Sequence, residues 1–180
     1  MKGFTLTELL VVTAIFSIAV GAISGIFVSG VFSQRRILAE QDVLSQISYT
    51  IEYMGRAIRM AKKDDIPIGG QTKNCLSEEK ANYQVNSEET KITFRNYHNE
   101  CQSFFLSSNQ IFEDKDGTLL PLTSPAIKVN ALKFKISGEK QEDNLQPRVT
   151  IFMEIESKVK NSPKIKIQTT ISQRDIDVQY

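Results

Sequence analysis

Charged residues divide the chain into an uncharged N-terminal stretch and a mixed remainder. From Leu9 to Gln34 no residue is charged, and most are apolar. A helix needs about 20 residues to cross the hydrocarbon core of a bilayer, which is about 30 Å thick. The apolar core of a cleaved secretory signal is shorter, about 7–15 residues, and a small-residue cleavage site follows it. Neither feature fits here, so the stretch predicts one membrane-spanning helix.

The helical pattern continues beyond the membrane as a single apolar stripe on an otherwise polar helix. Lys62 and Lys63 suit a helix C-terminus, and Pro67 breaks the pattern, so we expect the helix to end at about residue 63. The stripe could form a coiled coil or cover a sheet. It consists of Ile37, Leu44, Ile47, Ile51, Met54, Ile58 and Ala61.

The second half of the chain alternates apolar and polar residues, a pattern that predicts strands with one buried face. Residues 69–89 are polar and predict a loop. The buried strand faces need a cover, and the helical stripe is the long apolar surface that can supply it. The fold class is therefore α+β, with a long N-terminal helix packed on an antiparallel β-sheet. The expected strands are Lys91–Asn96, Ser103–Leu106, Gln110–Glu113, Thr118–Leu122, Leu132–Ile136, Val149–Glu156 and Ile165–Ile171.

Net charge gives the whole protein no strong attraction to nucleic acid. The chain of 180 residues is 24% charged and has a formal net charge of +1. Segment 128–168 carries nine Lys or Arg and five Asp or Glu. Lysines on the solvent faces of strands account for that excess. We therefore do not expect nucleic-acid binding.

No group of residues indicates catalysis. The single histidine, His98, lies in a polar loop without a metal-spaced partner, and no nucleophile–base pair or phosphate loop is present. Residues 114–117 contain part of a calcium-loop pattern but lack its first acid and its closing glutamate, so they predict a turn. We expect no enzyme activity, no catalytic residue, no cofactor and no metal site, with weak calcium binding left open.

Small residues recur every fourth position within the apolar stretch. The row runs through Thr13, Ser17, Gly21, Gly25 and Ser29. Such rows allow membrane helices to approach closely. Because glycine and serine are also tolerated generally in membrane helices, contact with other anchor helices is one interpretation and ordinary membrane-helix composition is the other.

The residues before the apolar stretch carry a distinctive string. Gly3-Phe4-Thr5-Leu6-Thr7-Glu8, followed by a hydrophobic helix, resembles the class III signal of type IV pilins and of type II secretion pseudopilins. The same residues match a capping box, in which Thr5 and Glu8 satisfy free amides at a helix start. Both roles are open for Glu8.

The resemblance implies a processing and assembly pathway. A prepilin peptidase would cleave between Gly3 and Phe4, Phe4 would be N-methylated, and Glu8 would act in subunit assembly. The expected parts are a leader at 1–3, a membrane and filament-core helix at 4–32, and a pilin-like domain at 33–180. Partners would be other pilins or pseudopilins in a hetero-oligomeric filament and the inner-membrane assembly platform.

The implied location of the domain bears on the two cysteines. The resemblance places a single-pass anchor in the inner membrane with the C-terminal domain outside the cytoplasm, where disulfides form. Cys75 and Cys101 are therefore a possible disulfide, and two buried thiols are the alternative.

A weaker similarity narrows the group. Residues 167–172, Ile-Gln-Thr-Thr-Ile-Ser, and the stretch from Asp116 to Ile136 are similar to the J-type minor pseudopilins and their minor-pilin relatives. This implies a structural subunit, a minor pseudopilin or minor pilin, in assembly or initiation of the filament. The alternatives are a DNA-uptake minor pilin and a membrane-anchored enzyme.

Overall fold

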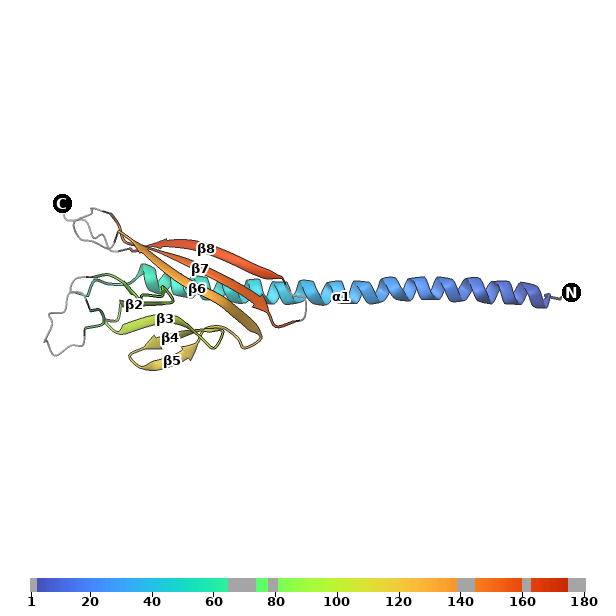
Figure 1. Cartoon of the computed structure of the whole chain (residues 1–180), viewed down its shortest axis with the longest axis horizontal. Coiled ribbons are helices and arrows are strands. Elements are labelled where there is room, and N and C mark those ends of the chain that lie inside the picture. The colour runs from blue at the N-terminus through green and yellow to red at the C-terminus, as the bar shows by residue number, and fades with distance from the viewer. Residues whose placement is uncertain (1–2, 65–73, 78–80, 139–144, 160–162, 175–180) are drawn as a thin grey trace. The chain divides into compact units, whose positions relative to one another are not determined.

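A computed structural model of the chain describes residues 3–64, 74–77, 81–138, 145–159 and 163–174. The chain forms two compact units, residues 1–39 and 40–180. Helix α1 (Leu6–Arg59) contributes to both (Figure 1). Its N-terminal half contains a window that is long and apolar enough to cross a membrane, and none of that window is buried. The C-terminal part of α1 belongs to the domain.

In the described part of the domain, eight strands form two antiparallel sheets (Figure 1). The first sheet has the order β1-β2-β3-β4-β5 and the second has the order β6-β7-β8. The strands are β1 (Gln84–Val85), β2 (Lys91–Arg95), β3 (Cys101–Ser107), β4 (Gln110–Lys115), β5 (Thr118–Pro121), β6 (Ile127–Ser137), β7 (Arg148–Ser157) and β8 (Lys164–Ser172).

The predicted fold class is confirmed, with one difference in the sheet. One long N-terminal helix packs on antiparallel strands, as the alternation indicated. The strands form two sheets, because only scattered bonds connect β6 to the first sheet. The amide of Val129 donates to the carbonyl of Asn109 at 2.9 Å, and that of Phe134 to Glu89 at 2.8 Å. Strand β1 was not predicted, since two residues are too few for an alternating pattern.

The stripe of α1 that faces the sheets differs in part from the predicted one. Val43, Ile47, Met54 and Ile58 are each at most 1% exposed. Leu44, which we expected to be buried, is 47% exposed, because the buried side of the helix runs through Val43 instead. The remaining predicted positions divide as follows: Ala61 is buried, Ile51 is half-buried, and Ile37 belongs to the N-terminal unit.

Helix α1 ends at Arg59, about one turn before the expected end at Lys63. The chain turns at Met60, and the amide of Lys62 then donates to the carbonyl of Arg95 in β2 at 2.9 Å. A sheet contact therefore replaces the last predicted helical turn. The lysines that were expected to favour the helix C-terminus lie beyond it.

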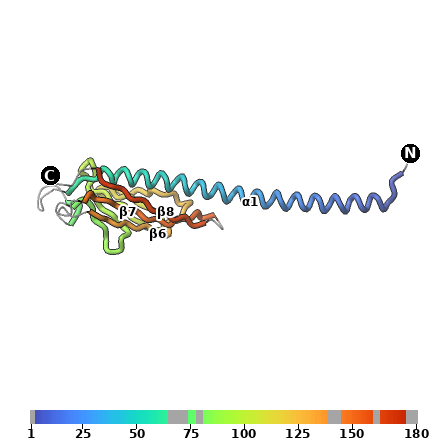
Figure 2. The backbone as a smooth tube through the Cα atoms, turned by 90° about the horizontal axis from the view of Figure 1, so that it is seen from above, coloured from blue at the N-terminus to red at the C-terminus, as the bar shows by residue number. Residues whose placement is uncertain are grey.

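The core draws on α1 and on both sheets. In the second sheet, β6 to β8 run beside the C-terminal part of α1 (Figure 2). The alternation in β7 is confirmed: every second side chain is at most 1% exposed, and the residues between them are not buried. The largest buried side chains are Phe94, Phe104, Phe134, Ile47, Met54 and Ile58.

One carboxylate is buried between α1 and the first sheet. Glu113 of β4 is 2% exposed and accepts hydrogen bonds from the hydroxyl of Tyr53, at 2.8 and 3.0 Å, and from the amide of Gln102. The ammonium of Lys115 lies 3.4 Å from the same carboxylate and 3.2 Å from the Tyr53 hydroxyl. These partners satisfy a charge that would otherwise strongly oppose burial.

The surroundings of Glu113 shift the pKa of Tyr53 and that of Lys115. Burial raises the pKa of the Tyr53 phenol, because it disfavours the charged phenolate. Burial acts to lower the pKa of Lys115, but the hydrogen bond to Tyr53 and the charge of Glu113 outweigh it and raise that pKa. Tyr53 therefore remains a neutral donor and Lys115 remains a cation.

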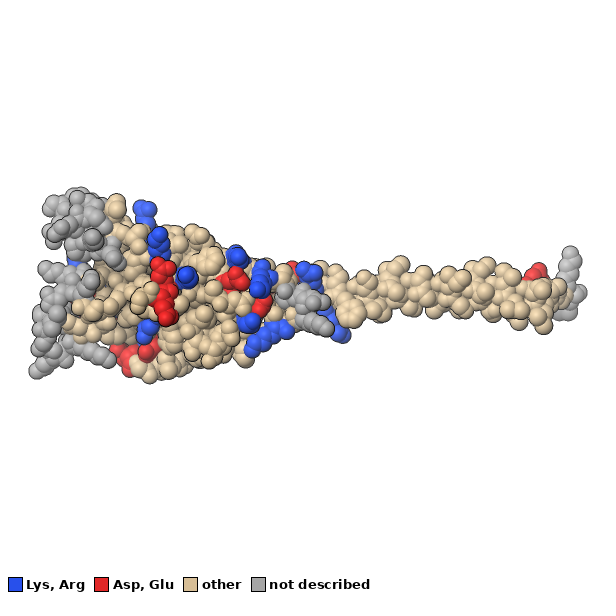
Figure 3. Space-filling model, viewed as in Figure 1, with Lys and Arg blue, Asp and Glu red and all other residues tan. Residues whose placement is uncertain are grey.

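Charged residues of both signs are interspersed over the domain face shown in Figure 3. On the solvent face of the second sheet, Lys128 lies 3.1 Å from Glu156, and Glu154 lies 3.7 Å from Lys164 and 3.5 Å from Lys166. The hydrogen bond from Lys128 lowers the pKa of Glu156. Lysines here alternate with carboxylates across the strands.

We expect Ile47→Asp to destabilise the domain by several kcal/mol, because a carboxylate at a 1% exposed position would have no partner. Leu44→Asp is the matched control on the exposed side of the same turn, and its effect should be small. Thermal unfolding of the two variants in detergent, followed by circular dichroism, makes the comparison. Equal melting temperatures for the two would contradict the assignment of the buried stripe.

Candidate functional site

The N-terminus of α1 forms a complete capping box. Thr5 is the residue before the helix and Glu8 is its third residue. The amide of Thr5 donates to Oε2 of Glu8 at 3.0 Å, and the amide of Glu8 donates to the hydroxyl of Thr5 at 3.4 Å. The Thr5 hydroxyl donates to Oε2 at 2.8 Å. The local role predicted for Glu8 is therefore present in the isolated chain.

The cap uses one of the two carboxylate oxygens of Glu8. Both bonds from Thr5 reach Oε2. Among the residues that the structure describes, no hydrogen bond to Oε1 is formed. A carboxylate can accept about four hydrogen bonds. Glu8 can thus hold its cap and still receive a cationic partner from outside the helix.

Phe4 and the apolar residues behind it lie on the surface of the N-terminal unit. Phe4 is 87% exposed, and Phe16 and Phe27 are exposed by 67% and 71%. A contiguous apolar surface of this size is unusual in a soluble monomer and marks contact with a membrane or with other proteins. The whole circumference of this part of α1 is therefore available to an apolar environment.

The row of small residues lies along this exposed helix. A methyl group added at Gly21 or Gly25 would meet nothing within 4 Å in the isolated chain. The hydroxyls in the row bond back to the helix: Thr13 donates to the carbonyl of Leu9 at 3.0 Å, and Ser17 donates to that of Thr13 at 2.8 Å. Ser29, the last member of the row, is also exposed. Within the described residues, no other part of the chain packs on Gly21 or Gly25.

Comparison with known families assigns this segment. Residues 1–24 match the family model of the prokaryotic N-terminal methylation motif. The chain carries a class III signal. No curated protein and no solved structure matches the chain. The class III signal and the helix-on-sheet architecture are consistent with a type IV pilin-like protein.

The class III signal indicates the general pathway of this chain. Proteins with this signal are processed by a prepilin peptidase and assemble with other pilins. The signal points to a structural subunit rather than an enzyme. The apolar N-terminal helix is consistent with single-pass anchoring in the inner membrane.

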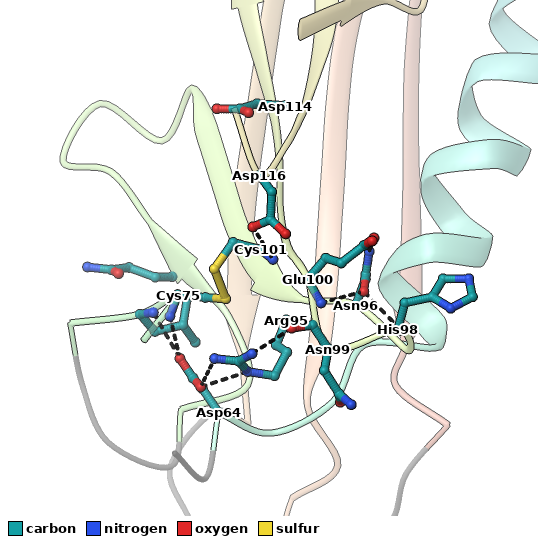
Figure 4. Close-up of a disulfide and its surroundings, with 12 residues drawn as sticks. Asp64, Cys75, Arg95, Asn96, His98, Asn99, Glu100, Cys101, Asp114 and Asp116 are labelled. Atoms are coloured by element: carbon teal, nitrogen blue, oxygen red, sulfur yellow. Dashed lines mark hydrogen bonds and ion pairs between the residues drawn. A yellow bond between two sulfur atoms is a disulfide. The ribbon is translucent and has the colours of Figure 1, made fainter. Parts of the chain in front are cut away.

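In the domain, the two cysteines form a disulfide that connects segment 74–77 to β3 (Figure 4). The Cα atoms of Cys75 and Cys101 are 5.2 Å apart, and the two residues are 26 positions apart in the chain. A crosslink over such a loop stabilises a fold by about 3–4 kcal/mol in the chain-entropy model. It joins the chain that follows α1 to the first residue of β3, the central strand of the first sheet.

A buried ion pair lies beside the disulfide (Figure 4). Asp64 and Arg95 are 2% and 3% exposed, and Nη2 of Arg95 lies 2.7 Å from Oδ1 of Asp64. The other carboxylate oxygen accepts the amides of Cys75 and Leu76 at 2.8 and 3.0 Å. Arg95 also donates to the carbonyl of Asn99 at 2.7 Å. Removing one partner of such a pair costs about 3–5 kcal/mol, because the other charge stays buried.

The acidic residues at 114–117 form a turn, and His98 lies in a separate loop. Asp114 accepts the amide of Gly117 at 2.9 Å, and Asp116 and Gly117 have positive φ angles of 46° and 90°, so the predicted turn is confirmed. His98 points away from the disulfide in Figure 4, and its ring lies 3.7 Å from that of Tyr97. Within the described segments, no group of three potential metal ligands occurs.

Sequence reasoning missed the buried ion pair and the Tyr53–Glu113 contact. The partners are separated by 31 positions in the first case and by 60 in the second. Alternation gave a partial signal for Glu113, since this residue falls on the buried side of β4 next to Ile111. No pattern in the sequence indicated which residue would neutralise it.

We expect thiol reagents to leave Cys75 and Cys101 unmodified in protein taken from outside the cytoplasm. Labelling after reduction in denaturant should modify both residues, which controls for their reactivity. Mass spectrometry reads the number of modified thiols. Labelling of both residues without reductant would contradict the disulfide.

Proposed function

We propose that this chain is a structural subunit, a minor pseudopilin or minor pilin, of a type II secretion pseudopilus or a type IV pilus. The observation that carries the proposal is the class III signal at residues 1–24 on a pilin-like fold. The subunit enters the filament by its N-terminal helix and takes part in assembly or initiation. The peptidase cleaves between Gly3 and Phe4, and Phe4 becomes N-methylated.

Glu8 fixes the subunit in the filament by pairing with the α-amine of Phe4 in a neighbouring subunit. Cleavage after Gly3 creates that amine, which is largely cationic at neutral pH. A carboxylate among apolar residues at membrane depth is costly without a partner. Oε1 of Glu8, which accepts no hydrogen bond from any described residue, supports this role, since the cap and the pair can exist together.

The row of small residues supports contact between anchor helices. Ser17, Gly21, Gly25 and Ser29 leave one side of α1 without bulk, and all four are exposed. Helices with such rows approach closely in lipid, where van der Waals contact drives association. In the filament this side of α1 faces a neighbouring helix.

The charges of the second sheet do not favour a DNA-uptake role. DNA capture needs a continuous positive surface, which makes binding steeply dependent on salt. Lys128, Lys164 and Lys166 instead lie within 4 Å of Glu154 or Glu156. The structural role therefore has the better support.

The first test of this function is processing. In cells with an active prepilin peptidase, the mature chain should begin with N-methyl-Phe4, because the signal places the cleavage after Gly3. Mass spectrometry of the native N-terminus measures this. An intact Met1 in those cells would contradict the proposal, and a strain without the peptidase provides the control.

The second test separates the two roles of Glu8. Glu8→Gln keeps an acceptor for the amide of Thr5 but removes the charge, whereas Thr5→Ala removes the hydroxyl of the cap and keeps the charge. We expect Glu8→Gln to be inserted and cleaved but to assemble poorly. Thr5→Ala should lose only about 1 kcal/mol of helix-end stability and assemble nearly normally.

Co-purification of each variant with its filament partners gives the readout. Normal assembly of Glu8→Gln with impaired assembly of Thr5→Ala would contradict the pairing role, and would mean that Glu8 acts only as a helix cap. The processing assay is run on the same samples, so that a failure of cleavage is not mistaken for a failure of assembly.

A further inference from the structure

In the part of the chain that the structure describes, strand β8 is an open edge of the second sheet. It pairs with β7 over residues 164–172, and it is the last strand in the order β6-β7-β8. Figures 1 and 2 both show it at the margin of its sheet. Along an edge strand, every second residue directs its N–H and C=O groups away from the paired strand, so these groups can bond to an added strand. At nine residues, β8 is a long edge.

The apolar row of the second sheet is incompletely covered at this edge. In β7 the inward side chains are at most 1% exposed. Their neighbours in β8, Ile165 and Ile167, pack on the same core but are only half-buried. Farther along β8, Ile171 is 5% exposed because it contacts α1 at Gly55. Among the described residues, no strand pairs with the first half of β8 on its open side.

The solvent face at the same place carries charges that alternate from strand to strand. Lys128 of β6, Glu156 of β7 and Lys164 of β8 occupy one row of the register, and Glu154 lies opposite Lys166 in the next. Lys164 and Lys166 share Glu154, at 3.7 and 3.5 Å, and remain 60% and 66% exposed. From β6 to β8, the charges in the row of Lys128, Glu156 and Lys164 are positive, negative and positive. A negative charge on a strand added beside β8 would continue this alternation.

We propose that β8 accepts an added strand from a neighbouring subunit, in which acidic residues alternate with apolar ones. Its acidic side chains lie opposite Lys164 and Lys166, and its apolar side chains cover Ile165 and Ile167. Backbone bonds supply the affinity, and the side chains on the two faces supply the selectivity. Pairing of opposite charges across strands adds to this selectivity.

The two described residues that follow β8, Gln173 and Arg174, bond to other parts of the domain. The amide of Gln173 donates to the carbonyl of Pro147 at 3.0 Å, and the amide of Arg174 donates to that of Arg59 at 2.8 Å. The Gln173 side chain is buried and donates to the carbonyl of Ala61 at 2.9 Å. These bonds hold the exit of β8 at the end of α1, which favours a strand from another molecule.

Only the identity of the partner as a filament subunit rests on the proposed function. The first experiment therefore uses a synthetic peptide and the full chain in detergent micelles. The probe is a short peptide in which glutamate alternates with valine, and the control peptide carries lysine in place of glutamate. The glutamate peptide, but not the lysine peptide, should slow hydrogen exchange in residues 164–172, as measured by mass spectrometry.

Two double variants test the charge pattern. Lys164→Glu with Lys166→Glu should weaken binding of the glutamate peptide about tenfold. Lys133→Glu with Lys135→Glu makes the same change of charge on exposed residues of β6, and should leave binding unchanged. Equal melting temperatures show that both variants are folded.

Three results would overturn the proposal: no slowing of exchange in β8, equal slowing by the lysine peptide, or full protection of every β8 amide without any peptide. The last result would mean that another segment of this chain, or a second copy, already occupies the edge. Each of these results is independent of N-terminal processing, so it leaves the proposed function standing. An intact Met1 would overturn that function and leave peptide binding standing.

The second experiment identifies the partner in cells. A photoreactive residue in place of Gln168, an exposed residue of β8, should crosslink to an acidic and apolar segment of another protein that carries a class III signal. The Lys164→Glu, Lys166→Glu variant should lose this product. Crosslinks that map only to proteins without that signal would overturn the neighbouring subunit as the partner.

Discussion

Within the domain, burial of one side of α1 is the constraint on which the sheets depend. Val43, Ile47, Met54 and Ile58 are excluded from water by strands of both sheets. Neither sheet could bury its own apolar row alone, because a single layer leaves that row in water. The two sheets are connected to each other by few backbone bonds, so the shared helix is what unites their cores.

The polar contacts at this boundary restrict how the helix can lie. Glu113 accepts bonds from Tyr53 of α1 and from Gln102 of the neighbouring strand. A buried carboxylate is tolerated only with such partners, and a rotation or shift of α1 would remove the Tyr53 hydroxyl from among them. Apolar packing alone accepts many similar arrangements, whereas a buried charge with fixed partners selects among them.

Much of the fold could be predicted from local patterns. The alternation in 149–156 and 165–171 placed β7 and β8, and the apolar stripe placed Ile47, Met54 and Ile58 against them. The errors occurred where a distant contact decided the local structure. Lys62 bonds to Arg95 instead of extending α1, and Leu44 is exposed beside the buried Val43. The cysteine pair could be suggested from its compartment, but the Asp64–Arg95 pair beside it had no sequence signature.

For the N-terminal signal, a short string was more informative than any periodicity, because a peptidase reads residue identities directly. The hydroxyls behind that string have a separate consequence. In the row of small residues, Thr13 and Ser17 already bond to carbonyls of their own helix. A helix packed against this row would therefore meet a smooth, narrow strip that offers few hydrogen bonds. Selection on this strip should act on side-chain size, so that alanine can replace serine where leucine cannot.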